Sequence, residues 1–313
     1  MAADILIRQL EYVVALAREE HFGRAAVACH VSQPALSAGV RKLERELGVT
    51  IVRRGRRFAG FTEEGRRVVA WAHRILAERD GLRSDLGRMH DQLTSTLRIG
   101  AIPTAVPPSP LVTIPFRHRH PQSRVRIEAL PSTEILRRLD GFEIDVGLTY
   151  IDQHTPESTS AIPLYREHYL LLTPSGGELA AREVVRWTDL GALPLCMLDT
   201  SMQNRRILDH SAAAAGARLA PVVETNTVDS LYAHAASGGY SSIIAHTWLH
   251  AFGIPAGMTT VPLAGPGPRP TVGIVTGRRP HSIAAQALLE VVGGLDVAAE
   301  LDRSATAATA ATG

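Results

Sequence analysis

The sequence predicts a mixed α/β chain in three parts: a small helical N-terminal domain, one long helix, and a larger two-lobed domain. Three observations predict this organisation. Short amphipathic segments fill residues 1–62, apolar residues recur every three or four positions over residues 63–93, and strand-like and helix-like segments alternate over residues 94–300. The remaining residues, 301–313, are low in complexity, and we expect them to be disordered.

The third helix of the first part is predicted by the stretch HVSQPALSAGVRKLERELG, residues 30–48. Ser32 is a favourable N-cap, Pro34 fits the first turn, where its missing N–H is not needed, and Gly48 is a typical residue just past a helix end. The opposite face carries small polar groups at its start and basic groups further along. The apolar residues follow one stripe, which we expect to be buried: Leu36, Val40, Leu43 and Leu47.

Two further helices are predicted before this one, over residues 7–20 and 23–30. On the first of them, Leu10, Val13, Val14 and Ala17 are expected to share one face. A brief turn at Val31 then leads into the third helix, which is the order of a helix-turn-helix. Residues 49–62, VTIVRRGRRFAGFT, add two short strand-like runs around four arginines and predict a basic hairpin, or wing.

Basic charge is concentrated in this part of the chain. Residues 1–93 carry sixteen Arg and Lys against twelve Asp and Glu, so the overall net charge of +2 conceals a basic N-terminal region. Basic charge in a helix-turn-helix domain favours double-stranded DNA as partner, with the second helix of the motif in the major groove. The residues expected to contact DNA are Ser32, Gln33, Pro34, Ser37, Arg41, Arg53, Arg54 and Arg56.

These residues are expected to act in two ways. Gln33 can pair bidentately with adenine, Pro34 can pack against a thymine methyl group, and the serines can reach bases or phosphates. The arginines are expected to bind phosphates and to fix position rather than read sequence. A pure helix cap is the alternative role for Ser32.

The long helix begins at Thr62, and Glu63 and Glu64 lie in its first turn, where carboxylates interact favourably with the helix dipole. Eight positions then follow a strict four-three spacing, and seven of them are apolar. They are Val68, Ala72, Ile75, Arg79, Leu82, Leu86, Met89 and Leu93. This spacing is typical of a coiled-coil seam, so we expect the helix to join two copies of the chain. Packing on its own domain is the alternative.

The third part contains seven strand-like segments, at residues 96–102, 124–130, 144–151, 169–174, 193–198, 220–225 and 241–246. Their alternation with helix-like segments predicts parallel sheets covered by helices. Pro163 and residues 264–270 are interpreted as two crossovers between lobes. Lobe I would then comprise about residues 96–163 and 268–300, and lobe II about residues 164–267.

The chain resembles LysR-type transcriptional regulators over almost its full length. The resemblance rests on QLEYVVALAREEHFGRAAVACHVSQPALSAGVRKLERELGV, residues 9–49, followed by RRGRRFAGFTEEG, residues 53–65. It implies a winged helix-turn-helix, a dimerising linker helix, and an effector domain shaped like two-lobed periplasmic binding proteins. The sequence departs from the family at Ala38 and Gly39, where Arg or Gln is frequent, and this gives more weight to Gln33, Ser37, Arg41 and the wing.

Polar residues follow four strands of the effector domain. In open α/β sheets, ligands bind beyond the carboxyl ends of the strands, and helix N-termini there attract anions. The resemblance implies effector contacts at the same junctions, although each residue could also be an ordinary helix cap. The candidate residues for a small, anionic effector are Thr104, Ser132, Thr133, Thr200, Met202, Gln203, Asn204 and Asn226.

Other chemistry is less well supported. Peroxide-sensing members of the family use a cysteine pair in the effector domain, whereas this domain has only Cys196, in an apolar run that predicts burial; Cys29 is expected to pack between helices. His118 and His120 lie near a helix end without nearby carboxylates, so we expect no metal there. No nucleophile–base or hydride-transfer motif is present, and neither catalysis nor a cofactor is expected.

The sequence therefore predicts a DNA-binding regulator, dimeric or tetrameric, whose promoter contacts respond to an effector held between two lobes. A two-lobed solute-binding protein and an architectural DNA-binding protein are the alternatives. No apolar run reaches membrane-spanning length, no secretory signal precedes the first helix, and two cysteines make no disulfide framework, so a cytoplasmic location is expected.

Overall fold

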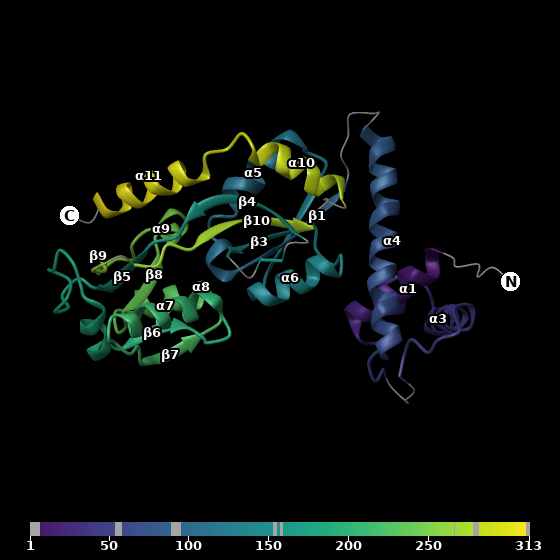
Figure 1. Cartoon of the computed structure of the whole chain (residues 1–313), viewed down its shortest axis with the longest axis horizontal. Coiled ribbons are helices and arrows are strands. Elements are labelled where there is room, and N and C mark those ends of the chain that lie inside the picture. The colour runs from purple at the N-terminus through teal and green to yellow at the C-terminus, as the bar shows by residue number, and fades with distance from the viewer. Residues whose placement is uncertain are drawn as a thin grey trace. The chain divides into compact units, whose positions relative to one another are not determined.

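The computed structural model describes residues 7–53, 58–88, 95–152, 155–156, 159–265, 267–277 and 282–310 (Figure 1). They form two compact units, which divide near residue 92. Among the described helices, none combines the length and the apolar character needed to cross a membrane.

The N-terminal unit is built from four helices. Helices α1 (Ile7–Glu19), α2 (Phe22–Ala28) and α3 (Gln33–Leu47) pack on one another, and α4 (Glu63–Arg88) packs on α1. An antiparallel bridge between Val52 and Phe61 precedes α4, as the predicted wing requires. Arg54 and Arg56 of the predicted wing lie outside the described residues.

The expected ends of α3 are confirmed, and so is its buried stripe except at Leu47, which is only partly buried. The Ser32 hydroxyl accepts a hydrogen bond from the Ala35 amide at 3.3 Å, and Gly48 ends the helix with φ of 68°, a left-handed conformation that suits glycine. Leu36, Val40 and Leu43 are buried in the core of the unit.

The predicted face of α1 is partly wrong. Leu10 and Val13 are buried as expected, but Val14 and Ala17 are only half-buried, while Tyr12 and Leu16 are buried instead. The reason is that α2, α3 and α4 all contact α1, so its buried surface is wider than that of a helix lying on one side of a domain.

Helix α4 has two apolar faces. One lies in the core of the N-terminal unit, where Ala72 is buried and Val68 and Leu76 are partly buried. Arg79 forms an ion pair with Glu11 of α1. Three positions of the predicted seam (Val68, Ala72 and Arg79) thus pack on or pair with the same unit, as the alternative interpretation expects.

The other face of α4 is exposed. Trp71 is 59% exposed, Ile75 38% and Leu82 62%. These residues, which we name the α4 stripe, lie along one side of a helix at positions four and seven apart. Met89 and Leu93 of the predicted seam, and the side chain of Leu86, lie outside the described residues.

The C-terminal unit contains a five-stranded sheet in one lobe. The strand order is β2 (Arg124–Ala129), β1 (Thr96–Ala101), β3 (Val146–Ile151), β10 (Thr271–Gly277) and β4 (Thr159–Arg166). β1 pairs in parallel with β2 and β3, whereas β10 runs antiparallel to β3 and β4. Helices α5 (Pro110–Arg119), α6 (Ser132–Asp140) and α10 (Ile283–Val292) belong to this lobe.

The second lobe contains two smaller sheets. β5 (Tyr169–Pro174) pairs antiparallel with β8 (Ser242–Ala245) and β9 (Met258–Pro262), and β6 (Leu195–Leu198) pairs in parallel with β7 (Pro221–Thr225). Helices α7 (Gln203–Ala214), α8 (Val228–Ala236) and α9 (Thr247–Phe252) accompany them. All seven predicted strands are present. The expectation of parallel sheets is wrong in part, because β5 and β8 pair antiparallel, and β4, β9 and β10 add further antiparallel pairs.

Two crossovers join the lobes. One runs from Arg166 to Tyr169 and the other from Pro262 to Thr271. The prediction that Pro163 marks a crossover is wrong. Pro163 lies within β4, opposite Gly273 and beside a shift in the strand register. A proline is tolerated there because β4 is an edge strand.

The expected disordered tail is wrong as far as residue 310, because α11 (Val297–Ala310) is helical. This helix packs against α9 of lobe II and β4 of lobe I. Leu301 is fully buried, and the Ser304 hydroxyl lies 2.7 Å from Nδ1 of His250. An alanine-rich segment of low complexity can be disordered or can form a helix, because alanine has a high helix propensity. Here the contacts with α9 and β4 stabilise the helix.

The start of α4 depends on Gly65. Its amide donates to the Thr62 hydroxyl at 2.8 Å, and a Cβ at this position would collide with the backbone carbonyl of Ile51. Alanine normally stabilises a helix relative to glycine. We expect Gly65→Ala instead to lower the free energy of unfolding by about 1–3 kcal/mol, the scale of an overpacked site. Thermal unfolding of the full chain would show this, with Glu64→Ala as the exposed control; an unchanged melting temperature in Gly65→Ala would contradict it.

Candidate functional site

A small pocket lies between the two lobes of the C-terminal unit. Lobe I lines it with Thr104, Ser132 and Tyr150, and lobe II with Met202, Gln203 and Asn204. Four apolar residues complete the lining: Ile102, Pro103, Pro131 and Leu198. The space that these residues leave suits a molecule of few non-hydrogen atoms.

The pocket lies where three parallel strands end. Thr104 follows β1, Ser132 begins α6 after β2, and Gln203 begins α7 after β6. No side chain caps the first amides of α7. Ser132 Oγ is buried without a hydrogen-bond partner among the described residues. The pocket therefore offers an unused hydroxyl and two helix N-termini to a polar ligand.

Three of the eight candidate effector residues do not line this pocket. Thr133, Thr200 and Asn226 are all exposed. Thr133 follows Ser132 on a helix and therefore points about a quarter-turn away. The junction at Asn226 is an ordinary helix start, because the Thr227 hydroxyl accepts from the Ser230 amide.

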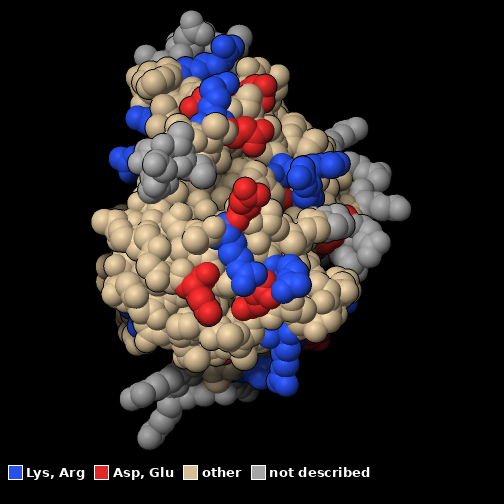
Figure 2. Space-filling model, turned by 90° about the vertical axis from the view of Figure 1, so that its left-hand side faces the viewer, with Lys and Arg blue, Asp and Glu red and all other residues tan. Residues whose placement is uncertain are grey.

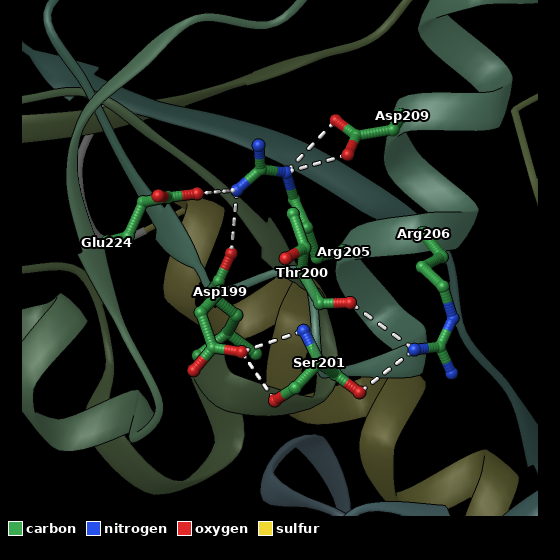
Figure 3. Close-up of polar contacts among 8 residues, drawn as sticks. Asp199, Thr200, Ser201, Arg205, Arg206, Asp209 and Glu224 are labelled. Carbon is green, nitrogen blue, oxygen red and sulfur yellow. Dashed lines mark hydrogen bonds and ion pairs between the residues drawn. The ribbon is translucent and has the colours of Figure 1, made fainter.

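The loop that carries Met202 is held by two arginines (Figure 3). Buried Arg205 donates to the Leu198 carbonyl at 3.0 Å and pairs with Asp209 and Glu224. Arg206 donates to the carbonyls of Thr200 and Ser201. These bonds fix the loop between β6 and α7, so its residues enter the pocket from a constrained backbone.

A buried carboxyl group lies behind the pocket. Glu167, in the first crossover, is fully buried, and its Oε2 is hydrogen-bonded to the hydroxyl groups of Tyr150 at 2.9 Å and Tyr169 at 2.7 Å. Tyr150 also contacts Thr104 Oγ1 at 3.3 Å, and Asn204 Nδ2 donates to the Tyr169 hydroxyl at 3.2 Å. A continuous chain of hydrogen bonds therefore joins the two walls of the pocket through Glu167.

Burial dominates the electrostatics of this chain. It raises the pKa of Glu167, and it raises the pKa values of Tyr150 and Tyr169 well above their usual range. Both tyrosines therefore remain protonated at neutral pH.

Sequence reasoning missed four of the residues that shape this site: Tyr150, Asp152, Glu167 and Tyr169. Tyr150 and Tyr169 lie within apolar strand segments and look like core residues. Gln203 donates to Asp152 across the pocket at 2.9 Å, a pairing of residues 51 positions apart. The sequence signal that could have pointed to Glu167 is a carboxyl group two residues before the apolar strand β5.

Most of the described residues expected to contact DNA lie on or directly before α3, and Arg53 lies exposed in the predicted wing. Gln33, Pro34 and Arg41 are exposed, and Ser37 is half-buried. Gly39 sits where the ring of Tyr12 packs, since a Cβ there would lie 2.5 Å from that ring. The family's frequent arginine or glutamine at this position would not fit without a shift.

Neither cysteine has a disulfide partner. Cys196 is fully buried in β6, as predicted, and burial raises its thiol pKa. Cys29 is half-buried beside α1, and burial raises its pKa too.

Over the described residues, no group of three or more His, Cys, Asp or Glu side chains could hold a metal ion. On the face seen in Figure 2, basic and acidic side chains are interspersed.

A helix-turn-helix with an exposed recognition helix, joined to a two-lobed domain with a small pocket, defines a ligand-responsive DNA-binding protein. Two family profiles match the chain: "Bacterial regulatory helix-turn-helix protein, lysR family" over residues 7–66, and "LysR substrate binding domain" over residues 90–295. The chain belongs to the LysR family of transcriptional regulators.

Relatives and solved structures agree with this membership. The DNA-binding transcriptional dual regulator OxyR of Escherichia coli is 33% identical over 275 residues, which cover 86% of this chain and 88% of OxyR. A probable hydrogen peroxide-inducible genes activator of Streptomyces viridosporus is 31% identical over 77% of this chain and 78% of its own. A full-length OxyR variant from Pseudomonas aeruginosa superposes with a TM-score of 0.75 at 28% identity, over 94% of this chain and 97% of that one.

The fold is also that of more distant regulators. CbnR in complex with its target DNA gives a TM-score of 0.64 at 20% identity, over 92% of this chain and 99% of that chain. By its two family profiles and its relatives, the protein is a LysR-type DNA-binding transcriptional regulator with an effector-binding domain.

Proposed function

We propose that this regulator responds to a small anion bound in the pocket between Thr104, Ser132 and the start of α7. The observation that carries the proposal is the buried Ser132 hydroxyl, which lines the pocket and has no partner among the described residues. Leaving such a group unpaired is costly, and an acceptor atom of a ligand would satisfy it. The two helix N-termini favour negative charge on that ligand.

The relatives suggest a second candidate function, a response to hydrogen peroxide, because several of them are named as hydrogen peroxide-inducible genes activators. A peroxide response through a disulfide within the effector domain is not supported, because Cys196 is the only cysteine of that domain and is buried in a strand. A buried thiol with a raised pKa contains little of the reactive thiolate. We therefore favour non-covalent binding.

The proposal extends to location and chemistry. A regulator of promoters works where the chromosome is, so we place it in the cytoplasm. The relatives are regulators rather than enzymes. The pocket likewise presents hydrogen-bonding groups without an activated nucleophile, and we propose binding without catalysis.

The effector pocket can be tested by removing single hydroxyls. A thermal-shift screen of small carboxylates and inorganic anions on the full chain would supply the ligand. We expect Ser132→Ala and Thr104→Val each to weaken its binding by about 1–2 kcal/mol, the scale of one buried hydrogen bond. Calorimetry is the measurement. Thr133→Val removes an exposed neighbouring hydroxyl and should bind as the parent does; equal losses in all three variants would place the site elsewhere.

The DNA interface separates into base reading and positioning. We expect Gln33→Ala to lose about 1–3 kcal/mol of discrimination at one base pair of each half-site, because an exposed glutamine can pair bidentately with adenine. Arg41→Ala should weaken all sequences alike and reduce the salt dependence by about one phosphate contact. Binding titrations on operator and random DNA would measure both. A uniform loss in Gln33→Ala would rule out base reading by that residue.

The α4 stripe is proposed to pair with the same stripe of a second copy. Ile75→Asp combined with Leu82→Asp would place charge in that apolar interface, and we expect the oligomer to dissociate. Both residues are exposed within the unit, so its own fold should survive. Size-exclusion chromatography with light scattering would report the mass, with Ile75→Leu and Leu82→Met as the apolar control. An unchanged mass in the aspartate variant would exclude this contact as the principal one.

A further inference from the structure

The hydrogen-bond chain behind the pocket has a direction that depends on one proton. An asparagine amide nitrogen can only donate, so Asn204 donates to the Tyr169 oxygen. The Tyr169 hydroxyl in turn donates to Glu167 Oε2 at 2.7 Å. This half of the chain therefore points toward the carboxyl group.

The other half can point either way. Tyr150 lies between Glu167 Oε2 and Thr104 Oγ1, and either oxygen of the Tyr150–Thr104 contact can be the donor. If Glu167 is ionised, Tyr150 donates to it, Thr104 donates to Tyr150, and Thr104 offers only lone pairs to the pocket. If Glu167 carries a proton, it donates to Tyr150, Tyr150 donates to Thr104, and the Thr104 hydrogen is free for a ligand.

The surroundings of Glu167 favour the protonated acid. Its side chain is fully buried, Oε1 has no hydrogen-bond partner, and among the described residues no arginine or lysine forms an ion pair with it. An ionised carboxylate with one oxygen unsolvated is far more costly to bury than a neutral carboxyl group. Burial raises the pKa of this group in agreement with that cost.

We propose that Glu167 is held as a neutral acid and that its proton makes Thr104 a hydrogen-bond donor to the effector, which gives the pocket its preference for anions. Glu167 is thus a specificity-determining residue that acts through Tyr150 without touching the ligand. The inference rests on the proposed effector pocket, since it explains which hydrogen-bonding role Thr104 plays there.

The groups around Glu167 allow this role to be isolated. Tyr150 of β3, Tyr165 of β4 and Tyr169 of β5 surround it, and burial raises the pKa of each. His168 and His246 stack beside the crossover with ring centroids 3.8 Å apart, and burial lowers both pKa values, that of His246 to about 3. Asp302 lies 3.9 Å from Nε2 of His246, and Arg269 acts on His168. Asp152 accepts a hydrogen bond from Gln203, whose side chain lines the pocket.

Infrared difference spectroscopy on the full chain tests the proton without any ligand. We expect the carbonyl stretch of a protonated carboxylic acid at about pH 7, where ordinary glutamates are ionised. The band should be absent in Glu167→Gln and present in Asp152→Asn. Absence of this band from the unsubstituted protein at neutral pH would overturn the proposal.

Ligand preference tests the consequence. Acetate and acetamide have nearly the same shape, but acetate only accepts hydrogen bonds. By ligand-observed NMR titration we expect acetate to bind more tightly at neutral pH. As pH rises through the point where the infrared band disappears, acetate affinity should fall about tenfold or more, the scale of one hydrogen bond to a charged group. Glu167→Gln, whose side chain does not titrate, should show an acetate affinity that stays constant over the same range, and Asp152→Asn should follow the parent.

The outcomes separate this inference from the pocket itself. Tighter binding of acetamide, or loss of the band with unchanged acetate affinity, would overturn the role of Glu167. Acetate binding that is indifferent to both Ser132→Ala and Thr104→Val would instead overturn the effector pocket, whatever the infrared spectrum shows. Melting curves of each variant would confirm that it folds.

Discussion

The effector domain depends on how a carboxyl group is accommodated where the two lobes meet. Glu167 lies in one crossover, and its backbone amide donates to the Pro270 carbonyl of the other at 2.9 Å. Its side chain is bonded by a tyrosine from each lobe. A change in the angle between the lobes would have to stretch these bonds or carry the tyrosines along. The pocket and the crossovers are therefore parts of one hydrogen-bonded structure, in which an event at Thr104 or Asn204 reaches the connection between lobes through three side chains.

A ligand can shift the balance between two lobe arrangements only by binding one of them better. The pocket meets this condition because its lining comes from both lobes. A molecule bound to Ser132 and to the start of α7 would hold the lobes at one separation. The arginines beneath the Met202 loop make that coupling efficient, since a loop held to β6 and β7 cannot absorb the ligand's contacts by moving alone.

Much of the fold could be predicted from the sequence, and the failures share a physical cause. Local signals were sufficient for α3, whose cap, stripe and terminal glycine lie within one stretch, and for the seven apolar strands. β4, β9 and β10 were missed because they carry polar, proline or glycine residues and are strands only through antiparallel partners far along the chain. Five of the eight effector candidates line one pocket, because strand ends converge in an α/β sheet. Thr133, Thr200 and Asn226 do not, since adjacent positions face different directions. Tyr150, Tyr169 and Glu167 were missed because the sequence around a tyrosine in an apolar strand does not show whether its hydroxyl group takes part in a buried hydrogen-bond network. Only the contacts in the folded protein show this.

The C-terminal helix has a practical consequence for anyone who works with this protein. α11 follows the α10 helix of lobe I and packs against α9 of lobe II, with Leu301 fully buried and Ala305 against the lobe II core. An affinity tag or reporter fused directly after residue 310 would therefore extend a helix that contacts both lobes. Removal of residues 297–310 would expose the surface of α9 that this helix covers. Such a change could alter the lobe equilibrium even though it lies far from the pocket in sequence. Fusions at this end need a flexible spacer if measured ligand responses are to belong to the unmodified regulator.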